Sequence, residues 1–525
     1  MNHVGARPGR QPAFTLLLVC GLAGLFGAAC TSRSPSSASQ ESQAQQGQSQ
    51  TSQAQTSQAQ TSQAQQSAES PTAPHDVVVI TTDDQTLESL RVMRDTSRLF
   101  NEQGTTFSDA VVSFPVCCPS RATWLTGRYA HNHGVRDNVA PLGGVEAFDP
   151  SDTVATRLAD VGYRTVFIGK YLNGYGRFGH EPAPGWSSWD ALIDPSTYSA
   201  FDYDISRDGE LVHYGRATSD YQTDVLANIA IDRITSTPAG QPLFVSVNFH
   251  VPHGANAESS TGTLADEPPE PAPRHVGAFA SEPLPPQLLT RGTGPYPAPI
   301  ANVPALDSAA VATITRRYRA ELESLLAVDE AVYRIVVALG RTGRLSNTVL
   351  LFTSDNGTFH GEHGLAAGKY YPYEPAIRVP LLARGPGFRA GATVDAPVAN
   401  VDLAPTILLA AGIADPQLDG VALQRSAAEP DAAMSRALLL EGKPMDQVEG
   451  QLPGFVGVRT HGWTYVRWAD GFEEIYDLTA DPQQQRNLAS TSDLTNWRSL
   501  AERLATCRGS SCVVETGDRP SASVG

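Results

Sequence analysis

Residues 116–128 read Val-Cys-Cys-Pro-Ser-Arg-Ala-Thr-Trp-Leu-Thr-Gly-Arg. Adjacent cysteines are poor disulfide partners for each other, because a disulfide needs its two Cα atoms further apart. Pro119 fixes φ and lacks an N–H, so we expect a helix to open at Pro119 or Ser120, just after Cys117 and Cys118. Unpaired N–H groups at a helix start favour an anion. Residue types alone leave open a reactive thiol or a buried cysteine pair without chemistry.

Length and charge narrow the class of protein. The chain has 525 residues, of which 41% are hydrophobic and 18% are charged, enough for one large domain and a smaller one. A formal net charge of −17 argues against a nucleic-acid partner, because binding phosphates needs basic surface. A small anionic substrate is still compatible, since it needs only a local cluster of cations. We therefore expect an acidic globular enzyme.

Residues 1–30 are typical of an export signal. Arg7 and Arg10 precede an apolar run at 14–26, which is too short to span a membrane. Gly27-Ala28-Ala29-Cys30 then resembles a bacterial lipobox, with glycine where an aliphatic residue is usual. The alternative is an ordinary signal peptide cleaved nearby. Both predict export, either as a lipid-anchored protein of a bacterial cell envelope or as a secreted protein.

Residues 31–74 predict a flexible linker. This stretch is dominated by Ser, Gln, Ala and Thr and repeats Thr-Ser-Gln-Ala-Gln three times in tandem from Thr51. It contains no aromatic or branched aliphatic residue, so it cannot bury a core. After a lipidated cysteine, such a tether would hold an enzyme away from the membrane.

Cys507 and Cys512 form a Cys-x4-Cys pattern near the C-terminus. In an exported protein such a pair can close a short disulfide loop. A metal site is the rival interpretation, but no further ligands lie nearby in the sequence. We expect the disulfide.

Four apolar runs predict the central strands. Each is continuous and ends in polar residues, which is typical of a strand buried on both faces. The runs lie at residues 77–80, 166–168, 243–249 and 349–352. Helical patterns at 153–161 and 313–339 lie between them. Strands alternating with helices predict an α/β fold with a largely parallel sheet and helices on both faces.

The ends of these runs predict a metal site. In a parallel sheet the site lies beyond the carboxyl ends of the strands. This rule brings together the polar residues Asp83, Asp84, Lys170, His253, Asp355 and Asn356. Three carboxylates and an amide oxygen suit Ca²⁺ better than Zn²⁺, although an Asp after a strand is more often a helix cap. Arg121, Lys170 and Lys369 are candidate cations for an anionic substrate.

As a set, the motifs resemble those of the type I sulfatases over residues 76–488. They are Thr82-Asp83-Asp84, Cys117-Cys118-Pro119-Ser120-Arg121, Leu125-Thr126-Gly127-Arg128, Gly169-Lys170, Pro252-His253, Ser354-Asp355-Asn356-Gly357, Gly361-Glu362-His363-Gly364-Leu365, Arg384-Gly385-Pro386-Gly387, Tyr476-Asp477-Leu478 and Asp481-Pro482. The resemblance implies an alkaline-phosphatase-like α/β domain with a large mixed, mostly parallel sheet at 75–425. It also implies a smaller C-terminal α+β subdomain with an antiparallel sheet, followed by a tail, at 426–525.

The resemblance also assigns roles. Cys117 would be converted to formylglycine (3-oxoalanine) by a formylglycine-generating enzyme and act as the nucleophile, with Cys118 at a variable position. One Ca²⁺ would be held by Asp83, Asp84, Asp355 and Asn356 together with residue 117. Lys170 and Lys369 would neutralise developing charge, Arg121 would hold the nucleophile, and His253 would protonate the leaving alcohol.

Within the family, the stretch from Lys170 to Gly176 looks like the N-acetylglucosamine-6-sulfatase branch. Arylsulfatases often carry histidine two residues after that lysine, whereas this chain has Leu172, which leaves His253 as the acid with His250 and His363 as weaker candidates. The expected substrate is a sulfated sugar or an aryl sulfate. The alternatives are an aryl sulfatase, a phosphate or phosphonate monoester hydrolase, which Asn356 disfavours, and an inactive lipid-anchored glycan-binding protein.

Overall fold

The computed structural model describes residues 74–177, 179–257, 265–292, 294–444 and 452–516. The chain divides into two units, residues 1–70 and 71–525, and every described residue belongs to the second. The predicted signal peptide and lipobox lie outside the described residues, as does all of the predicted linker except Pro74. In the part of the chain that is described, no helix is long and apolar enough to cross a membrane.

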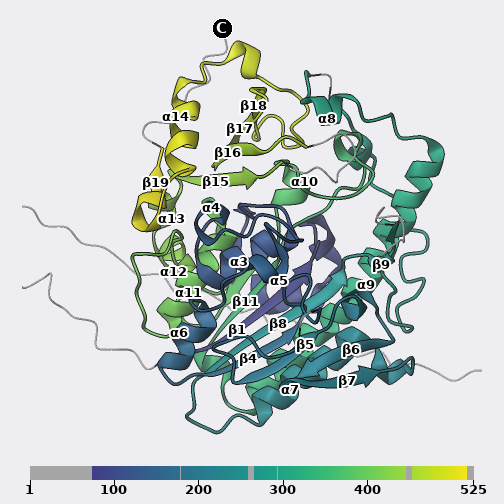
Figure 1. The fold of residues 1–525 in the computed structure, drawn as a ribbon, viewed down its shortest axis with the longest axis vertical. Helices are drawn as coiled ribbons and strands as arrows, with labels where there is room; N and C mark the ends of the chain where they lie inside the picture. The colour runs from purple at the N-terminus through teal and green to yellow at the C-terminus, as the bar shows by residue number, and fades with distance from the viewer. Residues whose placement is uncertain (1–73, 178, 258–264, 293, 445–451, 517–525) are drawn as a thin grey trace, which may run out of the picture. The chain divides into compact units, whose positions relative to one another are not determined.

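A ten-stranded mixed sheet forms the core of the second unit (Figure 1). Its strands run in the order β13 (Ala392–Val394), β2 (Thr105–Phe107), β12 (Leu381–Arg384), β11 (Thr348–Ser354), β1 (Asp76–Asp83), β8 (Leu243–Pro252), β4 (Arg164–Gly169), β5 (Ser188–Leu192), β6 (Tyr203–Arg207) and β7 (Glu210–Tyr214). β11, β1, β8, β4 and β5 are parallel, and β12, β6 and β7 add antiparallel pairs on the two sides.

The four predicted runs are the adjacent strands β11, β1, β8 and β4. Every residue of β1, β8 and β11 is buried, as the continuous apolar runs predicted. Because these strands are parallel, their carboxyl ends meet at one edge of the sheet. The polar residues that follow each run therefore come together there.

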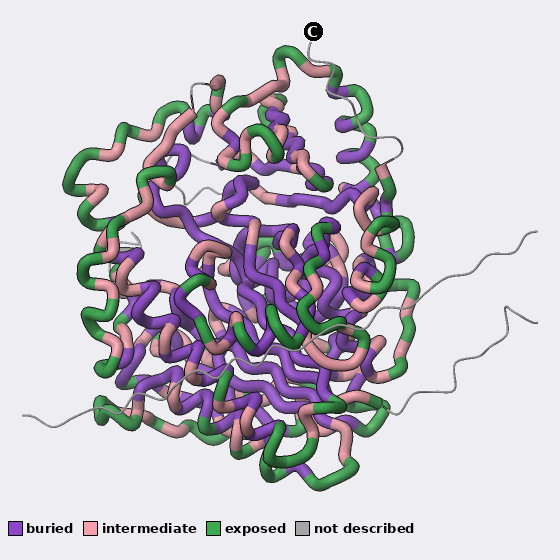
Figure 2. The backbone as a smooth tube through the Cα atoms, turned by 180° about the vertical axis from the view of Figure 1, so that it is seen from behind, coloured by how far each residue is buried: buried purple, intermediate pink, exposed green. Residues whose placement is uncertain are grey.

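Helices cover both faces of the sheet. Val78 and Ile80 of β1 pack in a cluster with α2 (Arg94–Asn101), α7 (Gln222–Thr235) and α9 (Ser308–Arg341). Val77 and Val79 point the other way, because side chains alternate along a strand, and pack with α3 (Cys117–Thr126), α6 (Val154–Asp160) and α11 (Leu403–Ala410). Figure 2 shows the buried backbone concentrated in the strands between these layers.

The C-terminal part forms a second, antiparallel sheet of five strands. Their order is β18 (Glu473–Asp477), β17 (Trp463–Trp468), β16 (Phe455–Thr460), β15 (Arg436–Gly442) and β19 (Val514–Glu515), and α14 (Thr495–Leu504) packs on β15 and β16. Cys507 and Cys512 form the predicted disulfide. The predicted α/β architecture with a smaller antiparallel subdomain is confirmed.

The start of α3 differs from the prediction. The helix begins at Cys117, and Val116 is its N-cap in extended conformation, with φ −148° and ψ 140°. Pro119 therefore occupies the third helical position, where its missing N–H costs nothing because the first-turn N–H groups have no intrahelical partner. Both cysteines lie inside the first turn rather than before it.

Candidate functional site

Cys117 lies at the start of α3, buried among charged groups. Its Sγ is 2.8 Å from Nζ of Lys369, 3.7 Å from Nζ of Lys170 and 3.5 Å from Oδ1 of Asp83. Burial raises the pKa of the Cys117 thiol, and the carboxylate of Asp83 raises it further, against the opposing effect of the two lysines. The thiol is therefore neutral at pH 7, although a helix start favours an anion.

Asp83 and Asp84 supply the acidic side of the site from the end of β1. Ligand atoms of Asp83, Asp84, Cys117 and His253 all lie within 4.8 Å of one another. Burial would raise the pKa of Asp83, but Lys170, His253 and Arg121 together hold it well below its ordinary value. The Asp83 carboxylate is therefore charged even though it is buried.

Asn356 offers an unused oxygen beside these carboxylates. Its Nδ2 donates to Oδ1 of Asp84 and, at 3.0 Å, to the carbonyl of Gly357. Its Oδ1 is buried and has no hydrogen-bond partner within the described chain. A buried acceptor without a partner is costly, and a cation would satisfy it. Hard oxygen donors of this kind fit Ca²⁺.

Asp355 precedes Asn356 just after β11 and links the end of β11 to the end of β1. Its Oδ1 accepts from the backbone N–H of Asp84 at 3.2 Å. Arg121, buried in α3, donates to the carboxylates of both Asp355 and Asp83 and, at 2.9 Å, to the carbonyl of Lys170. One guanidinium thus ties three strand ends to the helix that carries Cys117.

Two buried lysines face the sulfur of Cys117. Lys170 pairs with Asp83, and Lys369 pairs with Asp84. Burial lowers the pKa of each ammonium group, but its partner carboxylate raises it well above the ordinary value. Both lysines therefore carry a positive charge next to position 117.

His253 lies on the third side of the site. Its Nε2 is 3.7 Å from Oδ2 of Asp84, and its Nδ1 is 2.8 Å from the carbonyl of Gly254. A carbonyl only accepts, so Nδ1 carries a hydrogen and Nε2 faces the acidic groups. His250, by contrast, has its pKa lowered to about 3 by burial and by His253.

His363 is placed apart from this group. It stacks on Tyr373, with ring centroids 4.3 Å apart, and contacts Phe359 and Tyr296 edge-on. Burial, followed by the nearby Arg291, lowers its pKa to about 4. Its surroundings are aromatic rather than acidic.

The structure brings all nine predicted site residues into one contact network. They are Asp83, Asp84, Cys117, Arg121, Lys170, His253, Asp355, Asn356 and Lys369. Sequence reasoning missed Asn138, which accepts from the backbone N–H of Cys118 at 2.9 Å, and Tyr198, whose ring lies 4.7 Å from Nζ of Lys170. No motif marks either residue, so the sequence offered no signal for them.

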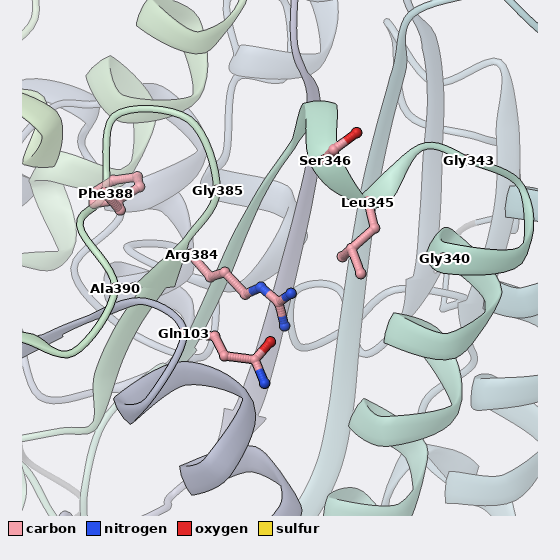
Figure 3. Close-up of a pocket in the computed structure, with 9 residues that line it drawn as sticks. All are labelled: Gln103, Gly340, Gly343, Leu345, Ser346, Arg384, Gly385, Phe388 and Ala390. Atoms are coloured by element: carbon pink, nitrogen blue, oxygen red, sulfur yellow. The ribbon is translucent and has the colours of Figure 1, made fainter.

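A cavity of about 480 Å³ lies near the opposite edge of the sheet, close to the start of β11. Gln103 and Arg384 point into it, and Gly340, Gly343 and Ser346 border it (Figure 3). Arg384 donates to the carbonyl of Leu99 at 3.5 Å. The C-terminal end of α9 borders this cavity, and helix carbonyl ends favour a cation. Arg384 is therefore held by the backbone around this cavity. The lining of the cavity does not include Cys117 or the other residues of the site.

Comparison with known families identifies the chain. The sulfatase family model matches residues 75–413. A second model, described as N-sulphoglucosamine sulphohydrolase, C-terminal, matches residues 361–509. The first match alone covers more than half of the chain, including every site residue described above.

Curated relatives and solved structures agree with this result. Human N-acetylglucosamine-6-sulfatase is 31% identical over 96% of this chain and 90% of its own length. A putative extracellular sulfatase Sulf-1 homolog of Caenorhabditis elegans is 35% identical over 65% of this chain, which spans only 47% of that relative. A structure solved with its substrate D-glucosamine-2-N,6-O-disulfate shares the fold, with a TM-score of 0.67, 24% identity and coverage of 82% of this chain and 97% of that one. The chain therefore belongs to the type I sulfatase family, in the branch that resembles N-acetylglucosamine-6-sulfatases, and is a sulfuric ester hydrolase.

Proposed function

We propose that this enzyme removes sulfate from a sulfated sugar or glycan, with an N-acetylglucosamine 6-sulfate as the first candidate. The observation that carries the proposal is the position of Cys117, which lies between the ammonium groups of Lys170 and Lys369 with two aspartates beside it. The two ammonium groups and the carboxylates that could hold a metal ion together provide positive charge for the negatively charged oxygens of a sulfate ester. The name of the human relative and the ligand of the solved neighbour support the choice of sugar.

Two groups implied by the family fit the residues present. A formylglycine at position 117 would supply the hydrate oxygen that attacks sulfur. A Ca²⁺ ion held by Asp83, Asp84, Asp355 and Asn356 would supply Lewis-acid polarisation of a sulfate oxygen. The unpartnered Oδ1 of Asn356 supports this ligand set.

The lysines provide the electrostatic part of the mechanism. Lys170 and Lys369 are both charged and buried, so they act in a region from which water is largely excluded. Fixed cations stabilise the charge that develops on sulfate oxygens in the transition state more strongly there than in water. Arg121 holds Asp83 and Asp355 in place while this happens.

His253 provides the proton. A sugar alkoxide is a poor leaving group, so its oxygen must be protonated as the bond to sulfur breaks. With Nδ1 bonded to the carbonyl of Gly254, Nε2 is the nitrogen that faces the site and can carry that proton. Leu172 cannot take this role, which leaves the task to His253.

The test is sulfate release from N-acetylglucosamine 6-sulfate. The full chain is co-expressed with a formylglycine-generating enzyme, and the aldehyde at residue 117 is verified by peptide mass. Cys117→Ala and Cys117→Ser serve as controls, because neither can yield formylglycine by the same route. Release that disappears in both controls supports the proposal, whereas an active serine variant contradicts the formylglycine nucleophile.

A comparison of ester substrates separates the alternatives. Sulfate and phosphate esters of the same alcohol share a leaving group, so their relative rates distinguish a sulfatase from a phosphate or phosphonate monoester hydrolase. An enzyme that cleaves aryl sulfates but no sugar sulfate would contradict the sugar assignment and leave the chemistry intact. Unmodified Cys117 in protein from the native host would instead favour the inactive glycan-binding alternative.

We also propose that the enzyme is exported and held at the cell envelope through a lipid on Cys30, with residues 31–74 as the tether. The support is the sequence Gly27-Ala28-Ala29-Cys30 after the apolar run. A Cys30→Ser variant should then move from the membrane fraction to the soluble or secreted fraction. An unchanged distribution would contradict the anchor.

A further inference from the structure

The ring of Tyr198 lies between two groups of the site. Tyr198 ends the short 3₁₀ helix η2 (Ser196–Tyr198), which follows β5. Nζ of Lys170 is 4.7 Å from the centre of the ring, and the imidazole of His253 lies 5.2 Å from it, tilted by 45°. Its hydroxyl group faces away from them, toward Asn173. One aromatic ring therefore contacts both the cation and the acid of the proposed mechanism.

We propose that Tyr198 is a positioning residue of this sulfatase, whose ring fixes the ammonium group of Lys170 and the imidazole of His253 relative to residue 117. The inference rests on the proposed function, because it concerns the same site. It adds a residue that no motif of the family resemblance includes. Tyr198 itself is not assigned a contact with the substrate.

The surrounding contacts hold the ring still. Asn173 donates from Nδ2 to the Tyr198 hydroxyl oxygen at 2.8 Å, and its Oδ1 lies 3.3 Å from Sγ of Cys118. Gln222 donates to the carbonyls of Thr197 and Ser199 at 3.0 and 2.8 Å, which fixes the backbone on both sides of Tyr198. The ring is thus tied to α7 and to the helix that carries the nucleophile.

Lys170 needs such a support. A lysine side chain has many rotamers, and ordering it costs conformational entropy. Two of its contacts are directional, the ion pair with Asp83 and the contact with Sγ of Cys117, and the face of Tyr198 provides the third. An aromatic face attracts an ammonium group most strongly where water is excluded. Removing the ring would free the ammonium group to shift away from residue 117.

His253 is oriented from two sides. The carbonyl of Gly254 fixes Nδ1, and the ring of Tyr198 limits rotation of the imidazole plane. His250 packs perpendicular to the same tyrosine ring, with the ring centres 5.5 Å apart, and adds a further contact to it. Loss of the ring would let the imidazole turn, so the proton would no longer point consistently at the leaving oxygen.

These two roles predict different dependence on the leaving group. Charge stabilisation by Lys170 matters for every sulfate ester, whereas protonation by His253 matters only for a poor leaving group such as a sugar alkoxide. Replacing the Tyr198 ring should therefore lower kcat for a sugar sulfate more than kcat for 4-nitrophenyl sulfate, whose leaving group needs no acid. A merely structural defect would lower both equally.

The experiment uses the modified full-length enzyme. Tyr198→Phe keeps the ring and should lose about threefold or less in kcat, because only the hydrogen bond from Asn173 is removed. Tyr198→Leu should lose about tenfold or more with the sugar sulfate, within the range expected for a desolvated cation–π contact plus a misplaced acid. Phenylalanines carrying one, two and three ring fluorines at position 198 keep the shape and weaken the cation–π attraction, so kcat should fall stepwise.

Tyr203 provides the matched control. It is a fully buried tyrosine of β6 that stacks on Tyr214 at 5.4 Å. Tyr203→Leu removes another buried tyrosine ring without touching Lys170 or His253, so it should lower thermal stability and leave the ratio of the two kcat values unchanged. If Tyr198→Leu behaves like Tyr203→Leu, or if fluorination has no effect on kcat, the positioning role is wrong.

Binding of inorganic sulfate, measured by calorimetry, gives a readout that needs no turnover. Tyr198→Leu should weaken sulfate binding about threefold or more, because Lys170 is less well held, and Tyr198→Phe should bind within about twofold of the wild type. Wild-type enzyme that cleaves no sulfate ester would contradict the proposed function. In that case unchanged sulfate binding by Tyr198→Leu contradicts the role of Tyr198, and weaker binding supports it.

Discussion

Arg121 donates its Nε hydrogen to Oδ2 of Asp355 across 2.9 Å, and both side chains are buried. The same guanidinium reaches Oδ2 of Asp83 at 3.2 Å, so it neutralises carboxylates at the ends of two neighbouring strands. Burial raises the pKa of Asp355, as does the adjacent Asp83, and Arg121 opposes both. The arginine therefore pairs with both of these predicted metal-binding carboxylates and holds them in place.

We predict that Arg121→Ala destabilises the fold. Removing one partner of a buried ion pair leaves the other charge uncompensated, which costs roughly 3–5 kcal/mol. The free energy of unfolding from urea titration measures this loss. Arg121→Lys should recover part of it, because lysine restores the charge but cannot reach both carboxylates in the same geometry.

Arg384→Ala is the control for this prediction. Arg384 is only partly buried, and its side chain donates to the carbonyl of Leu99 at 3.5 Å. Its removal should change the free energy of unfolding by about 1 kcal/mol or less. Equal losses for Arg121→Ala and Arg384→Ala would contradict the role of the buried pair.

Metal removal should abolish turnover reversibly. A strong chelator is expected to inactivate the enzyme, and added Ca²⁺ is expected to restore it, because the proposed ion supplies the Lewis acid that polarises a sulfate oxygen. Asn356→Ala should raise the Ca²⁺ concentration needed for half-maximal recovery on the order of tenfold or more. Calcium titration of chelated enzyme measures both effects.

Asn347→Ala is the matched amide control for Asn356. Asn347 lies in η5 (Leu345–Asn347), before the amino end of β11, and bonds to His75. Its removal should leave the calcium requirement unchanged. Full activity in the presence of the chelator would contradict the metal site.

The central strands could be predicted from the sequence because burial on both faces leaves a continuous apolar run. The shortest strands could not be predicted. β2 and β13 of the central sheet have three residues each, and β14 (Val398–Ala399), which belongs to a separate two-stranded sheet, has two, so none is long enough to show a period of two. The sequence places the start of α3 too late, at Pro119 or Ser120, because proline is common at the first helical position, whereas it is tolerated anywhere in the first turn.

The site residues were predictable where each directly follows a predicted strand or belongs to a motif. Asp83, Asp355 and Asn356 are examples, since strand order alone brings them to one edge of the sheet. Tyr198 is different, because its place depends on the path of the chain between β5 and β6. His131 could not be interpreted either, since its partners, Glu441 and the carbonyl of Cys507, are distant in sequence.

Glu474 should make the stability of the enzyme depend on pH. This glutamate is buried in the C-terminal sheet and accepts hydrogen bonds from Tyr373, Tyr476 and Trp468. Burial raises its pKa from 4.5 to about 7. The folded state therefore holds this proton more tightly, and the associated stabilisation is complete below pH 4.5 and is lost as pH rises through 7. The loss is roughly 3 kcal/mol for a shift of this size.

Glu474→Gln should remove this dependence, because the amide does not titrate. Urea unfolding at intervals between pH 5 and 8 should show a smaller decline of the free energy of unfolding for the variant than for the wild type. Glu473→Gln is the control: Arg498 and Tyr465 bind that partly buried neighbour and lower its pKa. A wild-type decline that persists unchanged in Glu474→Gln would contradict the prediction.

The disulfide loop should contribute stability without taking part in catalysis. Cys507 offers its carbonyl to His131 and Asn132 at 2.8 and 2.9 Å, and Gly509 donates to Asp419 at 2.7 Å, so the loop docks on the short helix α4 (Ala130–His133) and on Asp419. Replacing both Cys507 and Cys512 with serine should lower the free energy of unfolding by about 2 kcal/mol, the chain-entropy value for so short a loop. Reductant should destabilise the wild type by a similar amount and leave the double variant unchanged, as urea titration can show. If reductant destabilises both proteins equally, a different bond is responsible and the loop has no such role.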